Sequence, residues 1–165
     1  MSNMTPHSDY EKLQQLLPYV REYQALAEKH GISDIFQDNG GKILQMLLLT
    51  GLSGMKKREG NDATNEGGEE FELKTVNVKL TKSVSTNHHL NLAIINKYRK
   101  AKWVFAVYEN IELKEIWTLT PDKLKHLFDK WEDKWNATQT DINNPKIPLS
   151  LVISEGVKYY PSVDF

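Results

Sequence analysis

The chain contains no cysteine, which excludes a disulfide framework and any metal site built from thiolates. It also lacks a long hydrophobic run, because the longest, from Ile43 to Leu52, is interrupted and too short to span a bilayer. The N-terminus is polar and acidic rather than basic and then apolar, so no signal peptide is visible. These absences predict a soluble, cytoplasmic protein without membrane association.

An excess of one charge sign is also missing, since the net charge is only −1. This balance argues against a general coat for nucleic acid. The charges are nevertheless unevenly spread, with acids gathered in 59–72 and 109–133. No acid occurs between Lys74 and Lys102, where the basic residues are Lys74, Lys79, Lys82, Lys97, Arg99, Lys100 and Lys102. This asymmetry favours a local surface for a polyanion, and the alternative is a set of lysines that decorate exposed elements.

A length of 165 residues predicts a single domain, 1–165, with a substantial core. Ser8-Asp9-Tyr10-Glu11 has the form of a capping box and predicts a helix that ends near Gly31. The order of elements, helices first and then a sheet with inserted helices, predicts an α/β or α+β fold. The remaining expected elements are helices at 41–52, 94–100 and 121–135, strands at 59–64, 69–80, 103–108, 111–119 and 149–153, and loops at 81–92 and 136–147.

The most informative segment is Glu72-Leu73-Lys74, because Asp62 precedes its glutamate by ten residues. Two carboxylates can hold a divalent metal against a phosphodiester. A lysine beside them can orient or activate the attacking water and stabilise the charge of the transition state. The pattern therefore indicates a metal-dependent nuclease.

Glu-x-Lys is a weak pattern by itself, and the chain carries two further copies. Glu112-Leu113-Lys114 has no aspartate shortly before it. Glu132-Asp133-Lys134 does have Asp122 ten residues ahead, but it lies in a stretch with helical periodicity. Side chains two apart on a helix point about 200° apart. Glu132 and Lys134 are therefore expected to be solvated charges beside an apolar stripe.

The segment around Glu72 instead has strand periodicity, with Phe71 and Leu73 alternating with Glu72 and Lys74. Glu72 and Lys74 should share one face, about 7 Å apart. The turn-rich stretch 65–68 predicts a hairpin that returns Asp62 beside Glu72. The apolar parity shifts after residue 75, which suggests a bulge or a bend. The alternative is a surface hairpin with an ordinary ion pair.

Two polar segments could read DNA bases. Asn87-His88-His89 is a poor zinc site without a third ligand, but neutral histidines can donate or accept at base edges. Asn143-Asn144-Pro145 offers amides that match adenine N6 and N7, and it is also a common turn before proline. Asp38-Asn39-Gly40-Gly41 is by default a turn between helices. Each segment could equally be ordinary surface.

A family resemblance draws these segments together. The chain carries, in this order, HGISDIFQDNGGK, REGNDA, E-x-LK, LTK, ST-x-HH, KYR, DKWE-x-KW and DINNPKIP. From about Tyr10 to Tyr159 it closely resembles the PvuII-like type II restriction endonucleases, which belong to the PD-(D/E)xK nuclease superfamily. The resemblance implies a mixed central sheet flanked by helices. It also implies a homodimer that cuts the palindrome CAGCTG in double-stranded DNA at its centre, leaving blunt ends.

The resemblance assigns roles to matching residues. Asp62 and Glu72 would bind Mg²⁺ with the main-chain carbonyl of Leu73, Lys74 would assist the water, and Tyr98 would be an accessory catalytic residue. Glu59 is a weaker candidate. The residues implied in DNA binding are His88, His89 and Asn144 in the major groove, with Asn143 nearby, and Asp38 at the minor groove. A host would need a cognate DNA methyltransferase to protect its own sites, although not as a physical partner.

The same resemblance divides the chain into a dimerisation region at about 1–35, a catalytic and DNA-binding core at 36–135, and a recognition loop with a C-terminal strand and tail at 136–165. The chain departs from the family at Asn87, where the family has a third histidine, in the shorter loop 136–140, in residues 1–9 and in the tail Pro161–Phe165. None of these departures touches the expected metal ligands.

Two other functions fit the residues. A non-catalytic DNA-binding module would use the acids structurally, and it would not cleave DNA with Mg²⁺. A structure-specific nuclease would share the carboxylates and the lysine but would cut branched DNA.

Overall fold

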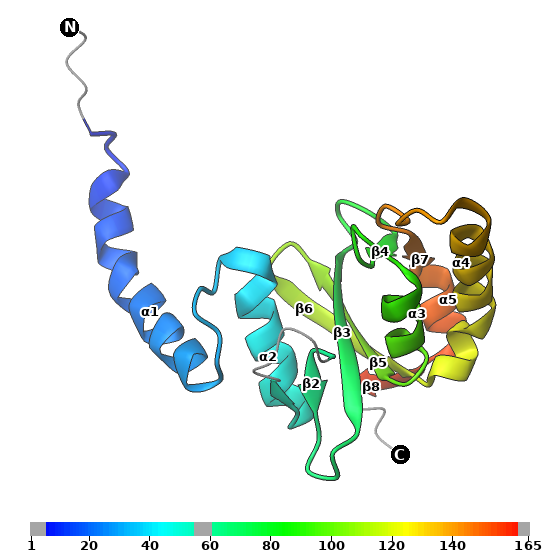
Figure 1. Cartoon of the computed structure of the whole chain (residues 1–165). Coiled ribbons are helices and arrows are strands. Elements are labelled where there is room, and N and C mark those ends of the chain that lie inside the picture. Colours follow the sequence, from blue (N-terminus) through cyan, green and yellow to red (C-terminus); the bar gives the residue numbers. More distant parts are fainter. Residues whose placement is uncertain (1–5, 55–60, 162–165) are drawn as a thin grey trace, which may run out of the picture. The chain divides into compact units, whose positions relative to one another are not determined.

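The computed structural model describes residues 6–54 and 61–161. Glu59 and the beginning of the strand expected at 59–64 lie outside these ranges. The chain forms two compact units, Met1–Leu44 and Gln45–Phe165 (Figure 1). No helix within the described ranges is long and apolar enough to cross a membrane.

The first unit contains the helix α1 (Tyr10–Lys29), the short 3-10 helix η1 (Gln37–Asn39) and the beginning of α2 (Gly40–Thr50). The capping box expected at 8–11 is wrong, because no side chain caps the N-terminus of α1. The Gln24 side chain instead organises the loop after α1. Its Nε2 donates to Ser33 O at 2.9 Å, and its Oε1 accepts from Ile35 N at 3.0 Å. The loop that leads to Asp38 is therefore tied to α1.

The second unit is built on a six-stranded sheet in the order β1-β2-β3-β5-β6-β8 (Figure 1). Neighbouring strands are antiparallel except β3 and β5, which are parallel. A second, two-stranded sheet pairs β4 with β7. The strands are β1 (Ser53–Gly54), β2 (Ala63–Thr64), β3 (Glu70–Asn77), β4 (Ser83–Ser85), β5 (Lys102–Glu109), β6 (Glu112–Leu119), β7 (Lys146–Pro148) and β8 (Val157–Tyr160).

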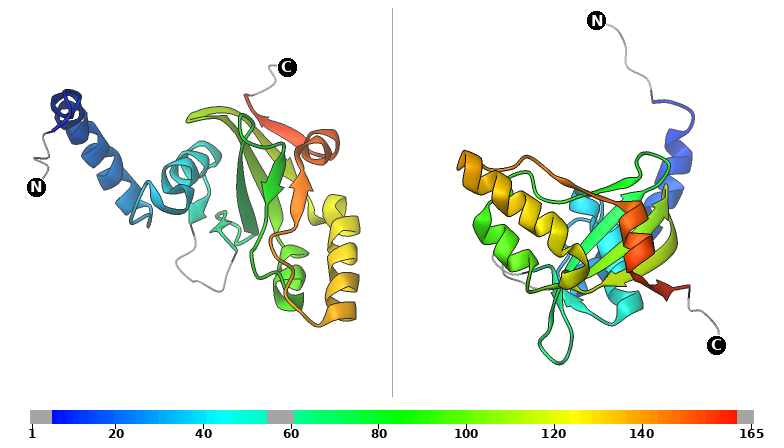
Figure 2. Two further views of the ribbon diagram at one scale, coloured as in Figure 1. Left: turned by 90° about the horizontal axis from the view of Figure 1, so that it is seen from above. Right: turned by 90° about the vertical axis from the view of Figure 1, so that its right-hand side faces the viewer.

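Helices from the second half of the chain cover one face of this sheet (Figure 2). They are α3 (Leu92–Tyr98), η2 (Pro121–Leu124), α4 (Lys125–Thr138) and α5 (Leu149–Glu155). The mixed sheet with flanking helices confirms the predicted fold class. The last strand expected at 149–153 is wrong, because this short apolar run forms α5 and buries Leu149 and Val152. Periodicity alone cannot distinguish a short buried strand from a helix.

Each of the loops expected at 81–92 and 136–147 contains residues of the second sheet. Its strands β4 and β7 are only three residues long. Val84 and Ile147 face each other across this ladder and are both buried in the main core. A strand of three residues shows too little alternation to be recognised in the sequence.

Strand β5 is buried on both faces, as expected for a central strand with a parallel neighbour. Trp103 and Phe105 stack on one face with ring centroids 5.7 Å apart, and Trp103 lies 5.9 Å from Phe128 of α4. The register pairs Glu72 of β3 with Trp103 and Lys74 with Phe105. The two polar side chains of β3 therefore lie at the edge of an aromatic layer.

The bulge expected after residue 75 is wrong, because β3 pairs with β5 without interruption from Phe71 to Asn77. The parity shift has another cause, which is that both faces of β3 are covered. Leu73 is buried on the face opposite Glu72, whereas Val76 is buried on the face of Glu72 and Lys74. The face of β3 that carries Glu72 and Lys74 is therefore polar at these two residues and becomes part of the hydrophobic core at Val76, which shifts the apolar alternation in the sequence.

Arg99, which follows α3 directly, fastens that helix to α4. Its guanidinium lies 2.9 Å from Asp129 and 2.5 Å from Glu132, and 5.7 Å from the ring centroid of Phe128. Glu132 is only partly exposed, so loss of its partner would leave a half-buried carboxylate without compensation.

Arg99→Met should therefore lower the free energy of unfolding, by about 1–3 kcal/mol for the charged hydrogen bond to Glu132 and the cation–ring contact. Lys125→Met is the matched control, because Lys125 also binds Asp129 but through an exposed pair at 2.5 Å. That control should leave stability unchanged within error. Urea denaturation measures the free energy of unfolding of both variants. If the two substitutions lowered it equally, the role given to Arg99 would be contradicted.

Candidate active site

The hairpin predicted ahead of Glu72 is present. Its turn runs from Asn65 to Glu69, with a hydrogen bond from Gly68 N to Asn65 O at 3.1 Å. Gly68 has φ +77°, a left-handed conformation that favours glycine. The strands pair Ala63 with Phe71, so the same register places Asp62 opposite Glu72.

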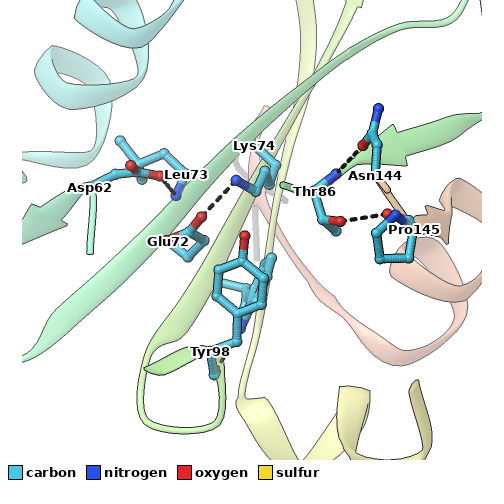
Figure 3. A network of polar contacts seen from close by, with 9 residues as sticks. Asp62, Glu72, Leu73, Lys74, Thr86, Tyr98, Asn144 and Pro145 are labelled. Carbon is cyan, nitrogen blue, oxygen red and sulfur yellow. Dashed lines mark hydrogen bonds and ion pairs between the residues drawn. The ribbon is translucent and has the colours of Figure 1, made fainter. Parts of the chain in front are cut away.

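The two carboxylates differ in exposure. Asp62 is exposed, and its Oδ2 accepts a hydrogen bond from Leu73 N at 2.8 Å. Glu72 is only 5% exposed, and its Oε1 lies 2.6 Å from Lys74 Nζ. Figure 3 shows both contacts on β3 and its partner strand. The site therefore has one carboxylate at the surface and one below it, with a lysine bound to the inner one.

Burial raises the pKa of Glu72, and the negative charge of Asp62 acts in the same direction. Lys74, and to a smaller extent Lys97, oppose this shift. The sequence identified Lys97 only as one cation of the basic stretch. Its effect on Glu72 depends on α3 packing near β3, which residue spacing does not reveal.

Tyr98 enters the site from the last position of α3. Its ring meets Trp103 edge to face with centroids 4.7 Å apart, and Lys74 Nζ lies 5.8 Å from its centroid. Figure 3 shows its hydroxyl pointing toward Glu72 and Lys74. Burial, followed by the charges of Glu72 and Asp62, raises the pKa of this hydroxyl. Tyr98 is therefore protonated at neutral pH and can donate a hydrogen bond, but it is not a base.

The donor set fits a hard divalent cation. Asp62 and Glu72 offer carboxylate oxygens, and the main-chain carbonyl of Leu73, the residue after Glu72, is a third oxygen donor of the kind that Mg²⁺ prefers. No cluster of three or more His, Cys, Asp or Glu side chains suited to a metal occurs in the described ranges. Burial is the main cause of the raised pKa of Glu72, and the repulsion from Asp62 that adds to it would be relieved by a cation between the carboxylates.

The other two Glu-x-Lys copies form no comparable site. Glu132 and Lys134 lie on α4, as predicted, and Glu112 is exposed on β6. Glu132 is not a free solvated charge, because it binds Arg99. That pairing is a correction to the expectation for this residue.

The expected base-reading segments meet in space. Leu90 and Ile142 form an antiparallel bridge, with hydrogen bonds of 3.1 Å and 2.8 Å in the two directions. This bridge brings exposed histidines and two asparagines together, since His88 Nδ1 lies 3.4 Å from Asn143 Oδ1. The structure therefore gathers His88, His89, Asn143 and Asn144 at one place, with Thr86 bound to Asn144.

Asp38 belongs to the first unit. It is exposed and has φ +49°, so its backbone adopts the left-handed conformation that asparagine and aspartate tolerate best. Asn39, with φ +60°, repeats this conformation. The helix-to-helix turn predicted here is present in a strained form.

The acid-free segment from Lys74 to Lys102 does not form a uniform surface of free positive charge that could bind a polyanion. Four of its cations form ion pairs within the protein, namely Lys74 with Glu72, Lys79 with Glu109, Arg99 with Asp129 and Glu132, and Lys102 with Glu69. Less positive charge is therefore available to a phosphate backbone than the sequence indicates.

A hairpin that sets two carboxylates and a lysine on a mixed, helix-flanked sheet defines a nuclease of the PD-(D/E)xK class. The family model for restriction endonuclease PvuII matches residues 8–160, and the chain belongs to this family. The protein is accordingly a type II restriction endonuclease, a phosphodiester hydrolase whose partner is DNA.

If Lys74 has the catalytic role expected from the sequence, Lys74→Met should reduce DNA cleavage by roughly 10²–10³-fold or more, because the positive charge expected beside the scissile phosphate is removed. DNA binding should be largely retained. The matched control is Lys134→Met, which alters the exposed lysine of the helical copy and should cleave normally. Cleavage of a supercoiled plasmid and electrophoretic mobility shift measure the two properties. A Lys74→Met protein that cuts at the wild-type rate would overturn this assignment.

Proposed function

We propose that this restriction endonuclease is a Mg²⁺-dependent homodimer that cuts CAGCTG at its centre to leave blunt ends. The observation that carries this proposal is the hairpin register, which sets Asp62 opposite Glu72, with Lys74 Nζ 2.6 Å from the glutamate. The target sequence and the cut position rest on the family resemblance.

The side chains divide the chemistry among themselves. Asp62, Glu72 and the Leu73 carbonyl would hold Mg²⁺, which supplies Lewis acidity toward the scissile phosphate and lowers the pKa of an attacking water. Lys74 orients that water and offsets the negative charge that develops on the phosphate oxygens. Tyr98 remains protonated and donates a hydrogen bond at the inner side of the site.

Recognition would use polar side chains outside the metal site. His88, His89 and Asn144 would contact base edges in the major groove, with Asn143 beside them. Asp38 would meet the guanine N2 amino group, which is the distinctive donor of the minor groove. Each half-site of a palindrome presents the same edges, so two identical subunits would read it symmetrically.

Helix α1 supplies a surface for the second subunit. Its exposed large apolar side chains are Tyr10, Leu13, Leu16, Tyr19, Tyr23 and Leu26. A helix that exposes so many apolar groups is unusual unless a partner covers them. A pair of subunits would also place one active site at each scissile phosphate and so produce a double-strand break.

Leu13→Lys combined with Leu16→Lys should shift the protein toward monomer, because two charges would enter an apolar interface. Sedimentation velocity measures the change. Gln14→Lys combined with Gln15→Lys adds the same charge to α1 at other exposed positions and serves as control. The proposed interface would be contradicted if the unaltered protein were a monomer, or if the protein with both leucines replaced by lysine remained fully dimeric.

The proposed activity itself is tested by digesting a plasmid of known sequence with and without Mg²⁺ and sequencing the ends. We expect blunt breaks at CAGCTG that require the metal. Metal-dependent cuts at another palindrome would refute the target sequence alone. Binding without cleavage would refute the catalytic roles, and preferential cutting of branched DNA would favour a structure-specific nuclease.

A further inference from the structure

The ladder between β4 and β7 changes character at Thr86. The regular pairs are Ser83 with Pro148, Val84 with Ile147 and Ser85 with Lys146. The next pair in this register would join Thr86 to Pro145, but proline has no N–H to donate. The main-chain ladder therefore cannot continue in its regular form.

Side chains replace the missing main-chain bond. The Thr86 hydroxyl donates to Pro145 O at 2.5 Å, and the Thr86 main-chain N–H donates to Asn144 Oδ1 at 3.0 Å. The Asn144 N–H in turn donates to Asn87 O at 2.9 Å. Figure 3 shows a dashed line from Thr86 to each of these two partners. Thr86 thus binds both the side chain of Asn144 and the main-chain carbonyl of the next residue, Pro145.

These contacts settle which end of the Asn144 amide faces outward. A main-chain N–H can only donate, so the amide oxygen must face Thr86 and the amide nitrogen must point away from it. Figure 3 shows the nitrogen in that position. Asn144 is about half-buried, its φ of +46° is a left-handed conformation that asparagine tolerates, and its main-chain N–H is bound to Asn87 O. The outward group is a donor with two hydrogens.

We propose that Thr86 is a positioning residue for DNA recognition, which fixes Asn144 so that its Nδ2 donates to the N7 atom of an adenine in the major groove. This inference rests on the proposed DNA-reading role of Asn144. Oδ1 retains a second lone pair, so it can also accept from adenine N6 while it stays bound to Thr86. Asn143 has no comparable anchor among its described contacts, because its oxygen meets only the exposed ring of His88 at 3.4 Å.

The test compares duplexes that carry the target with either adenine or 7-deazaadenine, which lacks the N7 acceptor. Binding is measured by fluorescence anisotropy in the cleavage-deficient Lys74→Met protein. With Thr86 and Asn144 intact, the loss of N7 should weaken binding by roughly tenfold. In Asn144→Asp, which keeps an acceptor for the Thr86 N–H but loses the outward donor, the two duplexes should bind equally.

Thr86→Val retains the main-chain N–H but loses the hydroxyl bond to Pro145. This change should reduce the weakening of binding caused by 7-deazaadenine to about threefold or less. Thr86→Ser, which keeps a hydroxyl, should restore the full weakening. Ser85→Ala is the matched control, since the Ser85 hydroxyl binds the side chain of Lys146 at 2.7 Å rather than the β7 backbone. Ser85→Ala should keep the full weakening by 7-deazaadenine, and Thr86→Val, Thr86→Ser and Ser85→Ala, which leave the charge unchanged, should bind scrambled DNA as the intact protein does.

The outcomes separate the two levels of the proposal. If the intact protein prefers the target but shows no N7 penalty, or if Thr86→Val keeps the full penalty, the inference fails and the restriction activity stands. If the protein does not distinguish target from scrambled DNA, the proposed recognition itself fails. Should Thr86→Val not fold, equal penalties in Asn144→Asp and the intact protein would still overturn the inference.

Discussion

The proposed active site depends on the register between β2 and β3. Asp62 faces Glu72 because Ala63 pairs with Phe71, and a shift of one residue would move Asp62 to the other side of the hairpin. Only two residue pairs define this register, so the turn must help to hold it. The bond from Gly68 to Asn65 closes that turn, and the Asn61 amide donates to Glu70 across the strands. The conformation of the turn is therefore part of the catalytic geometry.

The second requirement is a buried carboxylate. Burying Glu72 is unfavourable because it loses hydration, and this is why its pKa is raised. The protein limits that penalty with Lys74 at 2.6 Å and with the more distant charge of Lys97. The compensation is incomplete, since the pKa remains raised. An incompletely compensated pair of carboxylates attracts a cation, whereas full neutralisation by lysines would remove the reason to bind one.

Sequence periodicity was sufficient for the elements that carry the carboxylates. The alternation around Glu72 and the glycines before it predicted the hairpin, and helical spacing excluded Glu132 as part of a second site. Features that depend on tertiary neighbours could not be predicted. The parity shift at Val76 reflects a second buried face, and the apolar run from Leu149 forms a helix that buries Leu149 and Val152 in the main core. The roles of Arg99 and Thr86 arise from contacts 30 to 59 residues away in the chain.

Because β3 and β5 are parallel, one crossover segment between them carries both a segment proposed to read DNA bases and a residue of the proposed active site. Parallel strands cannot be joined by a tight turn, so the chain must cross over between them. In this protein the crossover carries β4, the segment with His88 and then α3, which ends at Tyr98. Leu90, which bridges to Ile142, is followed directly by Asn91, whose side chain caps α3 by accepting from Ile94 N at 3.1 Å. The base contact proposed for Asn144 would thus be linked, through a buried bridge and a capped helix, to the tyrosine beside Glu72. The placement of α3 is consequently tied to the Leu90–Ile142 bridge, which holds the segment proposed to read DNA.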